Sequence, residues 1–161
     1  MKKIALFIFA TTILVHANAQ LKTTAKCDAF VVDLLDGKVN DVHAGFTKGQ
    51  IETKLPCFTS EDPETSKCGS VVYYKNQDVK FYTGRDYIEI GPNFKGKLSI
   101  PLMGGKRGSF YKWLGLPKLK DTNWDAYETQ YGCLILYYNP QSKVRMIRFS
   151  TKTTDEINLC E

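Results

Sequence analysis

The clearest pattern in the sequence is an alternation of apolar and polar positions in the middle of the chain. β-Branched and aromatic residues dominate 70–74, 79–82 and 87–90, which is the composition typical of strands. The segments between them, 75–78 and 83–86, hold the Asn, Asp and Gly residues that favour tight turns. The pattern predicts an antiparallel meander of three strands.

A short helix is predicted directly before this meander. Thr47 and Gln50 have the spacing of a capping box, in which each side chain satisfies a free backbone N–H of the first turn. Ile51 and Leu55 are four residues apart and therefore share one helix face. Pro56 cannot continue the helix and ends it.

A second short helix is predicted over 108–117, with Ser109 as its candidate N-cap and Phe110 and Leu114 on one face. A polar loop over 118–129 follows. Segment 28–42 contains Asp36-Gly37, a dipeptide typical of hairpin turns. We therefore expect two short strands on either side of it, with a helix over 28–35 as the alternative. Further strands are expected at 97–100, 133–138, 144–149 and 157–159.

The two halves of the chain share one order of elements. Each has a short helix, a loop, a strand that ends in two tyrosines (73–74 and 137–138), a four-residue turn and a partner strand. This order predicts a tandem duplication, with unit one over about 28–95 and unit two over about 96–161. The expected fold class is α+β: an antiparallel sheet built from two tandem helix-plus-meander units, with short helices packed on one face.

Residues 1–19 predict export. Two lysines precede an apolar run over 4–15, and a small-residue pattern ends at Ala19, which together form the layout of a secretory signal peptide. Cleavage is expected after Ala19, leaving residues 20–161 as a single domain without a membrane span. The expected location is the periplasm or the extracellular space.

All five cysteines lie after the predicted cleavage point, and in an exported protein they indicate a disulfide framework. Cys57 and Cys68 enclose a polar segment and are expected to pair, and a bridge from Cys27 to Cys160 would tether the two ends. Cys133, inside an apolar strand, would then be a buried free thiol. In the alternative pairing, Cys133 is bridged to Cys160 and Cys27 is the unpaired cysteine.

The charge balance excludes several classes of protein. The formal net charge of +5 falls to +3 when Lys2 and Lys3 leave with the signal, which argues against nucleic-acid binding. The basic residues between 106 and 120 are interpreted as a solvated face rather than an anion site, and the glycines at 104–108 match no phosphate-loop motif. One histidine, His43, remains after cleavage, so no metal or other cofactor is expected.

Aromatic side chains are the candidate binding residues. Alternate residues of a strand face opposite sides of a sheet, so one tyrosine of each adjacent aromatic pair should lie opposite the helices. Exposed tyrosines and tryptophans make good contacts with protein partners, and the alternative is that they form cross-strand pairs that stiffen the sheet. The selected candidates are Tyr74, Tyr82, Tyr87, Trp124, Tyr127 and Tyr138.

The order of a short helix that ends at Leu-Gly-x-Pro, a loop, a strand with paired tyrosines and a returning strand resembles the half-unit of β-lactamase-inhibitor-protein-like folds. Small outer-membrane assembly lipoproteins have a similar half-unit. The resemblance covers about residues 40–150 and implies two tandem units whose sheets form one concave surface that grips a partner. It also implies a disulfide-closed loop in the first unit, which Cys57–Cys68 would match. The second unit lacks that cysteine pair.

The expected function is therefore an exported, non-catalytic protein-binding module of the inhibitor, immunity or envelope-assembly type, whose partner is another exported or envelope protein. Nothing in the sequence indicates its oligomeric state. The alternative is a protein that binds a small ligand or cell-wall glycan through the same aromatic residues. A Cys/His hydrolase is a third hypothesis, and it requires His43 within hydrogen-bond reach of a cysteine or carboxylate.

Overall fold

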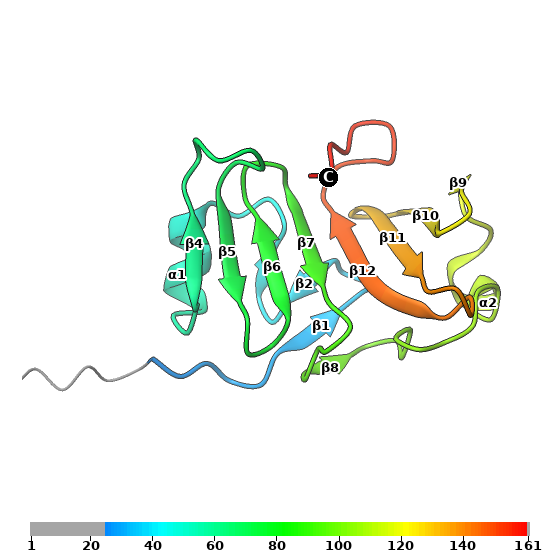
Figure 1. Cartoon of the computed structure of the whole chain (residues 1–161), viewed down its shortest axis with the longest axis horizontal. Helices are drawn as coiled ribbons and strands as arrows, with labels where there is room; N and C mark the ends of the chain where they lie inside the picture. The colour runs from blue at the N-terminus through cyan, green and yellow to red at the C-terminus, as the bar shows by residue number, and fades with distance from the viewer. Residues whose placement is uncertain (1–24, 161) are drawn as a thin grey trace, which may run out of the picture.

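Two β-sheets dominate the computed structural model, which describes residues 25–160 (Figure 1). The smaller sheet has four strands in the order β3-β2-β1-β8, and the larger has eight in the order β4-β5-β6-β7-β12-β11-β10-β9. The small sheet comprises β1 (Val31–Asp33), β2 (Lys38–Val39), β3 (Val42–His43) and β8 (Lys97–Leu98). The large sheet comprises β4 (Ser60–Asp62), β5 (Val71–Tyr74), β6 (Val79–Tyr82), β7 (Tyr87–Ile90), β9 (Leu119–Lys120), β10 (Trp124–Thr129), β11 (Gly132–Tyr138) and β12 (Val144–Ser150).

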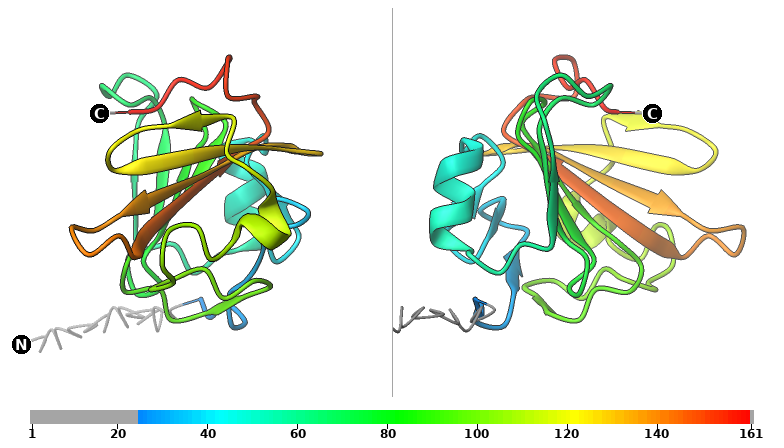
Figure 2. Two further views of the ribbon diagram at one scale, coloured as in Figure 1. Left: turned by 90° about the vertical axis from the view of Figure 1, so that its right-hand side faces the viewer. Right: turned by 60° about the vertical axis from the view of Figure 1, so that its left-hand side comes forward.

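The large sheet consists of two antiparallel meanders joined at their last strands. Strands β4 to β7 form one half and β9 to β12 the other, and β7 pairs with β12 through a register that places Ile90 opposite Ile147. The two halves are strongly twisted relative to one another (Figure 2), as expected for a wide sheet of right-handed twist. The duplication of the sequence itself stays a prediction.

One face of the large sheet packs against the small sheet and the helix α1 (Lys48–Lys54) to form the main core. Because side chains alternate along a strand, every second residue of the central strands enters this core. Helix α1 contributes Ile51, and its C-cap residue Leu55 accepts a hydrogen bond from the Tyr74 hydroxyl at 2.7 Å. The largest fully buried side chains of this core are Phe30, Leu34, Ile51, Tyr74, Phe81, Ile88, Ile90, Leu102, Tyr127, Leu134 and Phe149.

The first predicted helix is confirmed in its details. Thr47 is the N-cap, and the Thr47 and Gln50 side chains satisfy each other's backbone N–H groups as a capping box does. The turn between β1 and β2 is also confirmed, with Gly37 in the left-handed region at a φ of 65°. An added Cβ there would meet the Tyr131 ring, so glycine is required twice over.

The predicted α+β fold class is wrong. Helices make up 8% of the described residues and strands 35%, so the protein is mostly β with two sheets and two short helices. The second helix, α2, shrinks to Tyr111–Leu114, since Gly108 and Gly115 on either side adopt left-handed conformations. Its N-cap is Phe110 rather than Ser109.

Two polar segments expected to be loops contain strands, for a common reason. The predicted polar loop over 118–129 contains β9 and β10, and β4 lies within the segment between Cys57 and Cys68. Both regions are polar at the surface, yet neighbouring strands satisfy their backbone hydrogen bonds. The strand predicted at 157–159 is instead irregular.

The four cysteines expected in disulfides are bridged, but the predicted pairs are wrong. Cys27 pairs with Cys57 and Cys68 with Cys160, while Cys133 is free and buried as predicted. Strand β4 explains the difference, because it pairs with β5 as the first arm of a hairpin. Cys57 precedes this arm and Cys68 lies in the turn after it, so the length of the strand separates them.

The predicted signal peptide, residues 1–19, lies outside the described residues. The two disulfides are consistent with an oxidising location outside the cytoplasm. In the described part of the chain, neither helix is long enough to cross a bilayer.

Candidate functional site

The face of the large sheet opposite the main core, here called the outer face, carries one continuous row of side chains. The strand registers place one residue from each strand in line across the whole sheet. This central row runs Ser60, Tyr73, Lys80, Glu89, Arg148, Ile135, Ala126 and Leu119. It is polar and charged over the first half of the sheet and apolar over the second.

The charged half of the row is a network centred on Glu89. Its side chain is 6% exposed and pairs with Lys80 Nζ at 2.7 Å and Arg148 Nη2 at 2.8 Å. Arg148 also donates to the Tyr137 hydroxyl at 3.0 Å and lies over the rings of Tyr137 and Tyr87, at 4.9 and 5.5 Å from their centroids. The guanidinium is therefore held in one orientation by a carboxylate and two aromatic rings.

At the other end of the charged half of the row, Tyr73 is held by a hydrogen bond. Its hydroxyl donates to Asp62, and this hydrogen bond together with burial raises the pKa of Tyr73 to about 12. The phenol therefore stays neutral and remains a hydrogen-bond donor across the physiological range.

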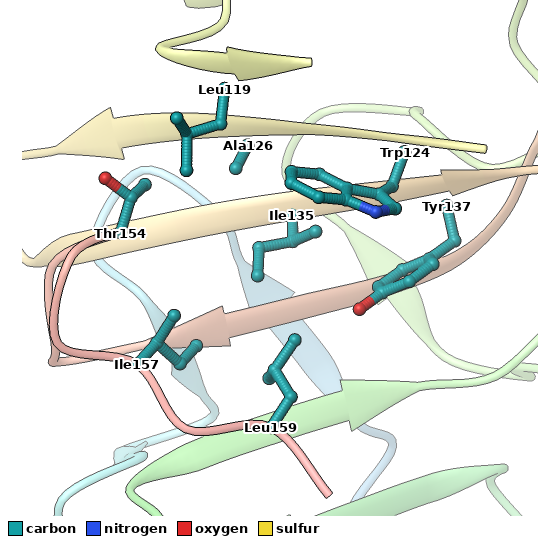
Figure 3. Close-up of a pocket in the computed structure, with 8 residues that line it drawn as sticks. All are labelled: Leu119, Trp124, Ala126, Ile135, Tyr137, Thr154, Ile157 and Leu159. Carbon is teal, nitrogen blue, oxygen red and sulfur yellow. The ribbon is translucent and has the colours of Figure 1, made fainter. Parts of the chain in front are cut away.

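The apolar half of the row forms the floor of a cleft of about 110 Å³ (Figure 3). Trp124 and Tyr137 lie side by side at one end, as directly opposed residues of β10 and β11. Apolar side chains from the sheet and from the end of the chain point into the same space. The cleft is lined by Leu119, Trp124, Ala126, Ile135, Tyr137, Thr154, Ile157 and Leu159.

Residues 151–160, here called the strap, cross the outer face and form one wall of this cleft. The strap is bound at its far end by the Cys68–Cys160 disulfide. Arg85 reinforces that end by donating to the Asn158 side chain at 2.7 Å and to the carbonyl oxygen of Cys68 at 3.1 Å. The Cys160 N–H donates to the Tyr87 hydroxyl at 3.2 Å.

The near end of the strap is held by Glu128. Its carboxylate accepts hydrogen bonds from the backbone and hydroxyl of Thr154, and Lys118 pairs with both Glu128 and Asp155. The hydrogen bond from Thr154, with that from Lys118, lowers the pKa of Glu128. The strap is thus fixed at both ends, so the cleft is pre-formed.

Arg107 holds the backbone that carries Trp124. It donates to the fully buried carboxylate of Asp125, and these hydrogen bonds raise the pKa of Arg107. Arg107 also donates to the carbonyl oxygens of Thr122, at 2.9 Å, and Trp124, at 3.3 Å. Tyr138 completes the group with a hydrogen bond to Asp125 at 2.9 Å. Arg107 is therefore a positioning residue for the cleft.

The structure places the six predicted binding residues in three environments. Tyr74, Tyr127 and Tyr138 point into the main core and are almost fully buried. Tyr82 and Tyr87 do lie on the outer face, stacked at 4.2 Å between ring centroids, but the strap covers them. Of the six, only Trp124 lies at the cleft. The five tyrosines offer a partner no surface in this arrangement.

The residues of the candidate site that the sequence analysis did not select include Tyr73, Tyr137, Arg148 and Leu119. The expected alternation of each tyrosine pair is confirmed, since Tyr73 and Tyr137 lie opposite the core. The wrong member of each pair was selected, because alternation shows that neighbours face opposite sides without showing which side is buried. Arg148 could have been noticed as a basic residue within a strand of alternating apolar and polar positions.

Cys133 and His43 do not come together. Cys133 lies on the outer face beneath the strap, with Ala126 and Ile135, and burial raises the pKa of its thiol to about 12. His43 lies on the small sheet, which covers the opposite face, with its ring beside Phe46. Within residues 25–160, no group of His, Cys, Asp or Glu side chains is placed to hold a metal ion.

Comparison of the chain with protein-family models, with curated proteins and with solved structures finds no match.

Proposed function

We propose that this protein is an exported, non-catalytic binding module, and that its partner is another exported protein that inserts an apolar side chain into the cleft. The observation that carries the proposal is the pairing of Trp124 and Tyr137 over a pre-formed apolar cleft, directly beside a fixed Arg148. The oxidised fold and the predicted signal peptide support export to the periplasm or beyond.

The residue types support a protein contact. Tryptophan, tyrosine and arginine dominate the energetically important positions of protein interfaces. Trp124 and Tyr137 are held by neighbouring strands, and Arg148 by Glu89, so a partner would lose little side-chain entropy on ordering them. The charged half of the central row would then supply polar contacts beside the apolar anchor.

The size of the cleft favours a side chain over a free small molecule. Its volume of about 110 Å³ is well below the roughly 300–1,000 Å³ of typical ligand pockets, whereas a single apolar side chain fits. A wider hollow of about 460 Å³ lies beside the Cys27–Cys57 disulfide and is lined in part by Ala25, the first described residue.

The test compares cleft variants in capture and in direct binding. Proteins of the native envelope fraction are captured on the oxidised protein, and any partner is purified and titrated. Trp124→Ala and Tyr137→Ala should each weaken that binding about 30-fold or more, the effect of an interface hot spot. Phe58→Ala, which removes a partly exposed aromatic ring elsewhere, is the matched control and should bind normally.

Two results would contradict the proposal. The first is a partner that binds the Trp124 and Tyr137 variants as tightly as the wild-type protein. The second is saturable quenching of Trp124 fluorescence, measured in a Trp113→Phe background, by cell-wall glycan fragments without any protein partner, which would favour the glycan-binding alternative.

A further inference from the structure

One end of the molecule combines an excess of positive charge with exposed apolar side chains. Between Glu89 and Asp121 the sequence contains seven lysines and arginines and no acidic residue. This segment runs from the end of β7 through β8 and α2 to β9, along the lower and right-hand sides of Figure 1. The rest of the chain has 15 basic and 17 acidic residues, so the net positive charge comes from this segment.

A β-bridge and hydrogen bonds bring four lysines together at this end. Lys106 and Lys143 are opposed in an isolated β-bridge. Arg107, next to Lys106, donates from its guanidinium to the carbonyl oxygen of Asp121, which follows Lys120. The fourth lysine, Lys112, is on α2, and the N–H of Tyr111 beside it donates to Gly108, close to Lys106 in the chain.

These four lysines, here called the basic end, are exposed. Within the described residues, none of Lys106, Lys112, Lys120 and Lys143 forms an ion pair. Lys118 differs, since Glu128 and Asp155 neutralise it at the base of the strap. The basic end thus keeps its charge available for an anionic partner.

Two apolar side chains project from the same end. Trp113 is 55% exposed and Leu116 is 80% exposed, on either side of the turn that Gly115 makes at a φ of 73°. Lys112 Nζ lies 4.3 Å from the centroid of the Trp113 ring. About half of the Trp113 surface and most of the Leu116 surface therefore face water, which is unfavourable for apolar side chains.

We propose that the basic end docks on an anionic lipid surface, with Trp113 and Leu116 entering the interfacial region and the four lysines contacting phosphate headgroups. Tryptophan beside lysine is the composition of membrane-interface anchors. A projecting tip needs no shaped pocket in a fluid lipid layer, whereas a folded acidic protein would have to supply one, and long lysine stems can reach the headgroups around the tip. This surface is separate from the cleft.

The test measures binding to vesicles by flotation. The full-length sequence is expressed in an exporting host, and the oxidised product is mixed with vesicles of phosphatidylcholine alone or of equal parts phosphatidylcholine and phosphatidylglycerol. We expect binding to the anionic vesicles only, and weaker binding as salt rises. In a Trp124→Phe background, Trp113 is the remaining tryptophan, and its emission should shift to the blue on binding.

Paired variants separate charge from insertion. Each lysine contributes about fivefold to binding at an anionic surface, so Lys106→Gln/Lys143→Gln should weaken binding about 30-fold. Trp113→Ala/Leu116→Gln should weaken it at least about tenfold, and Leu116→Gln in the Trp124→Phe background should reduce the blue shift of Trp113. Lys95→Gln/Lys97→Gln changes two exposed lysines at and just before β8, outside the basic end, and should have less than about a twofold effect.

Three outcomes would overturn the inference: no flotation with anionic vesicles, equal binding to both vesicle types, or unchanged binding by the basic-end variants. Saturable binding of soluble polyglutamate without vesicle binding would assign the basic end to an acidic polypeptide instead. Far-UV circular dichroism of each variant confirms folding, and all substituted side chains except Trp124 are exposed.

Discussion

The Cys68–Cys160 disulfide should stabilise the fold more than the Cys27–Cys57 disulfide. The first joins residues 92 positions apart and the second residues 30 positions apart. In the chain-entropy model, closing these loops restricts the unfolded state by about 4.6 and about 3.7 kcal/mol. Replacing the strap disulfide with serines should therefore cost about 1 kcal/mol more than replacing the other one.

The strap disulfide also has a local role that the other lacks. Ile157 and Leu159 of the strap cover Tyr87 and Cys133 on the outer face. Once Cys160 is no longer bound to Cys68, the end of the strap keeps only the packing of Ile157 and Leu159 and hydrogen bonds, mainly from Arg85. Local opening of the strap should then expose Cys133 well below the free energy of global unfolding.

The assay is urea unfolding of two double variants, Cys68→Ser/Cys160→Ser and Cys27→Ser/Cys57→Ser, followed by fluorescence and far-UV circular dichroism. Double variants leave no unpaired partner thiol. Native-state thiol labelling of Cys133 reports the local opening. The reasoning fails if the strap variant is the more stable of the two, if it loses less than about 2 kcal/mol, or if Cys133 stays protected in it.

Three further predictions concern single side chains. Arg107→Gln leaves the buried carboxylate of Asp125 without its cation and should cost about 3–5 kcal/mol in urea unfolding, and a loss under about 1 kcal/mol would contradict the positioning role. The pKa of Glu128 is lowered in the folded state from the ordinary value of 4.5, so its stabilising effect is complete above that value and lost as pH falls through the folded pKa. Thermal unfolding of Glu128→Gln should accordingly depend less on pH below about 4.5 than that of the wild type. Cys133 has a pKa of about 12, so in the native protein it should not react with DTNB at neutral pH, whereas denaturation should release one reactive thiol.

Local features of the fold were predictable because nearby residues decide them. The capping box of Thr47 and Gln50 needs contacts within one turn, and the turn at Gly37 needs one residue with a positive φ. The strands β5, β6 and β7 follow from alternating aromatic and β-branched residues. Strand β10 was missed because polar residues surround it and its pairing with β9 and β11 is set by tertiary contacts.

The sequence predicted that aromatic residues would lie on the face of the sheet opposite the helices, but not which aromatic residues these are. Adjacent tyrosines in a strand had to face opposite sides, and they do. Which of them is buried depends on the small sheet and α1 covering one face and the strap covering part of the other. Tyr74 and Tyr138 were therefore selected from the sequence, whereas the outer face carries Tyr73 and Tyr137. Of the six predicted residues, Trp124 alone lines the cleft.

The amino-acid order alone indicated a disulfide framework with one odd cysteine, a capped short helix and a central meander of three strands, because composition and short-range periodicity carry that information. Only the tertiary structure decided which cysteines meet, which face of the large sheet is buried, and how the last ten described residues enclose a cleft. Those features join residues up to 92 positions apart, and contacts of that range depend on the packing of whole sheets rather than on local preference.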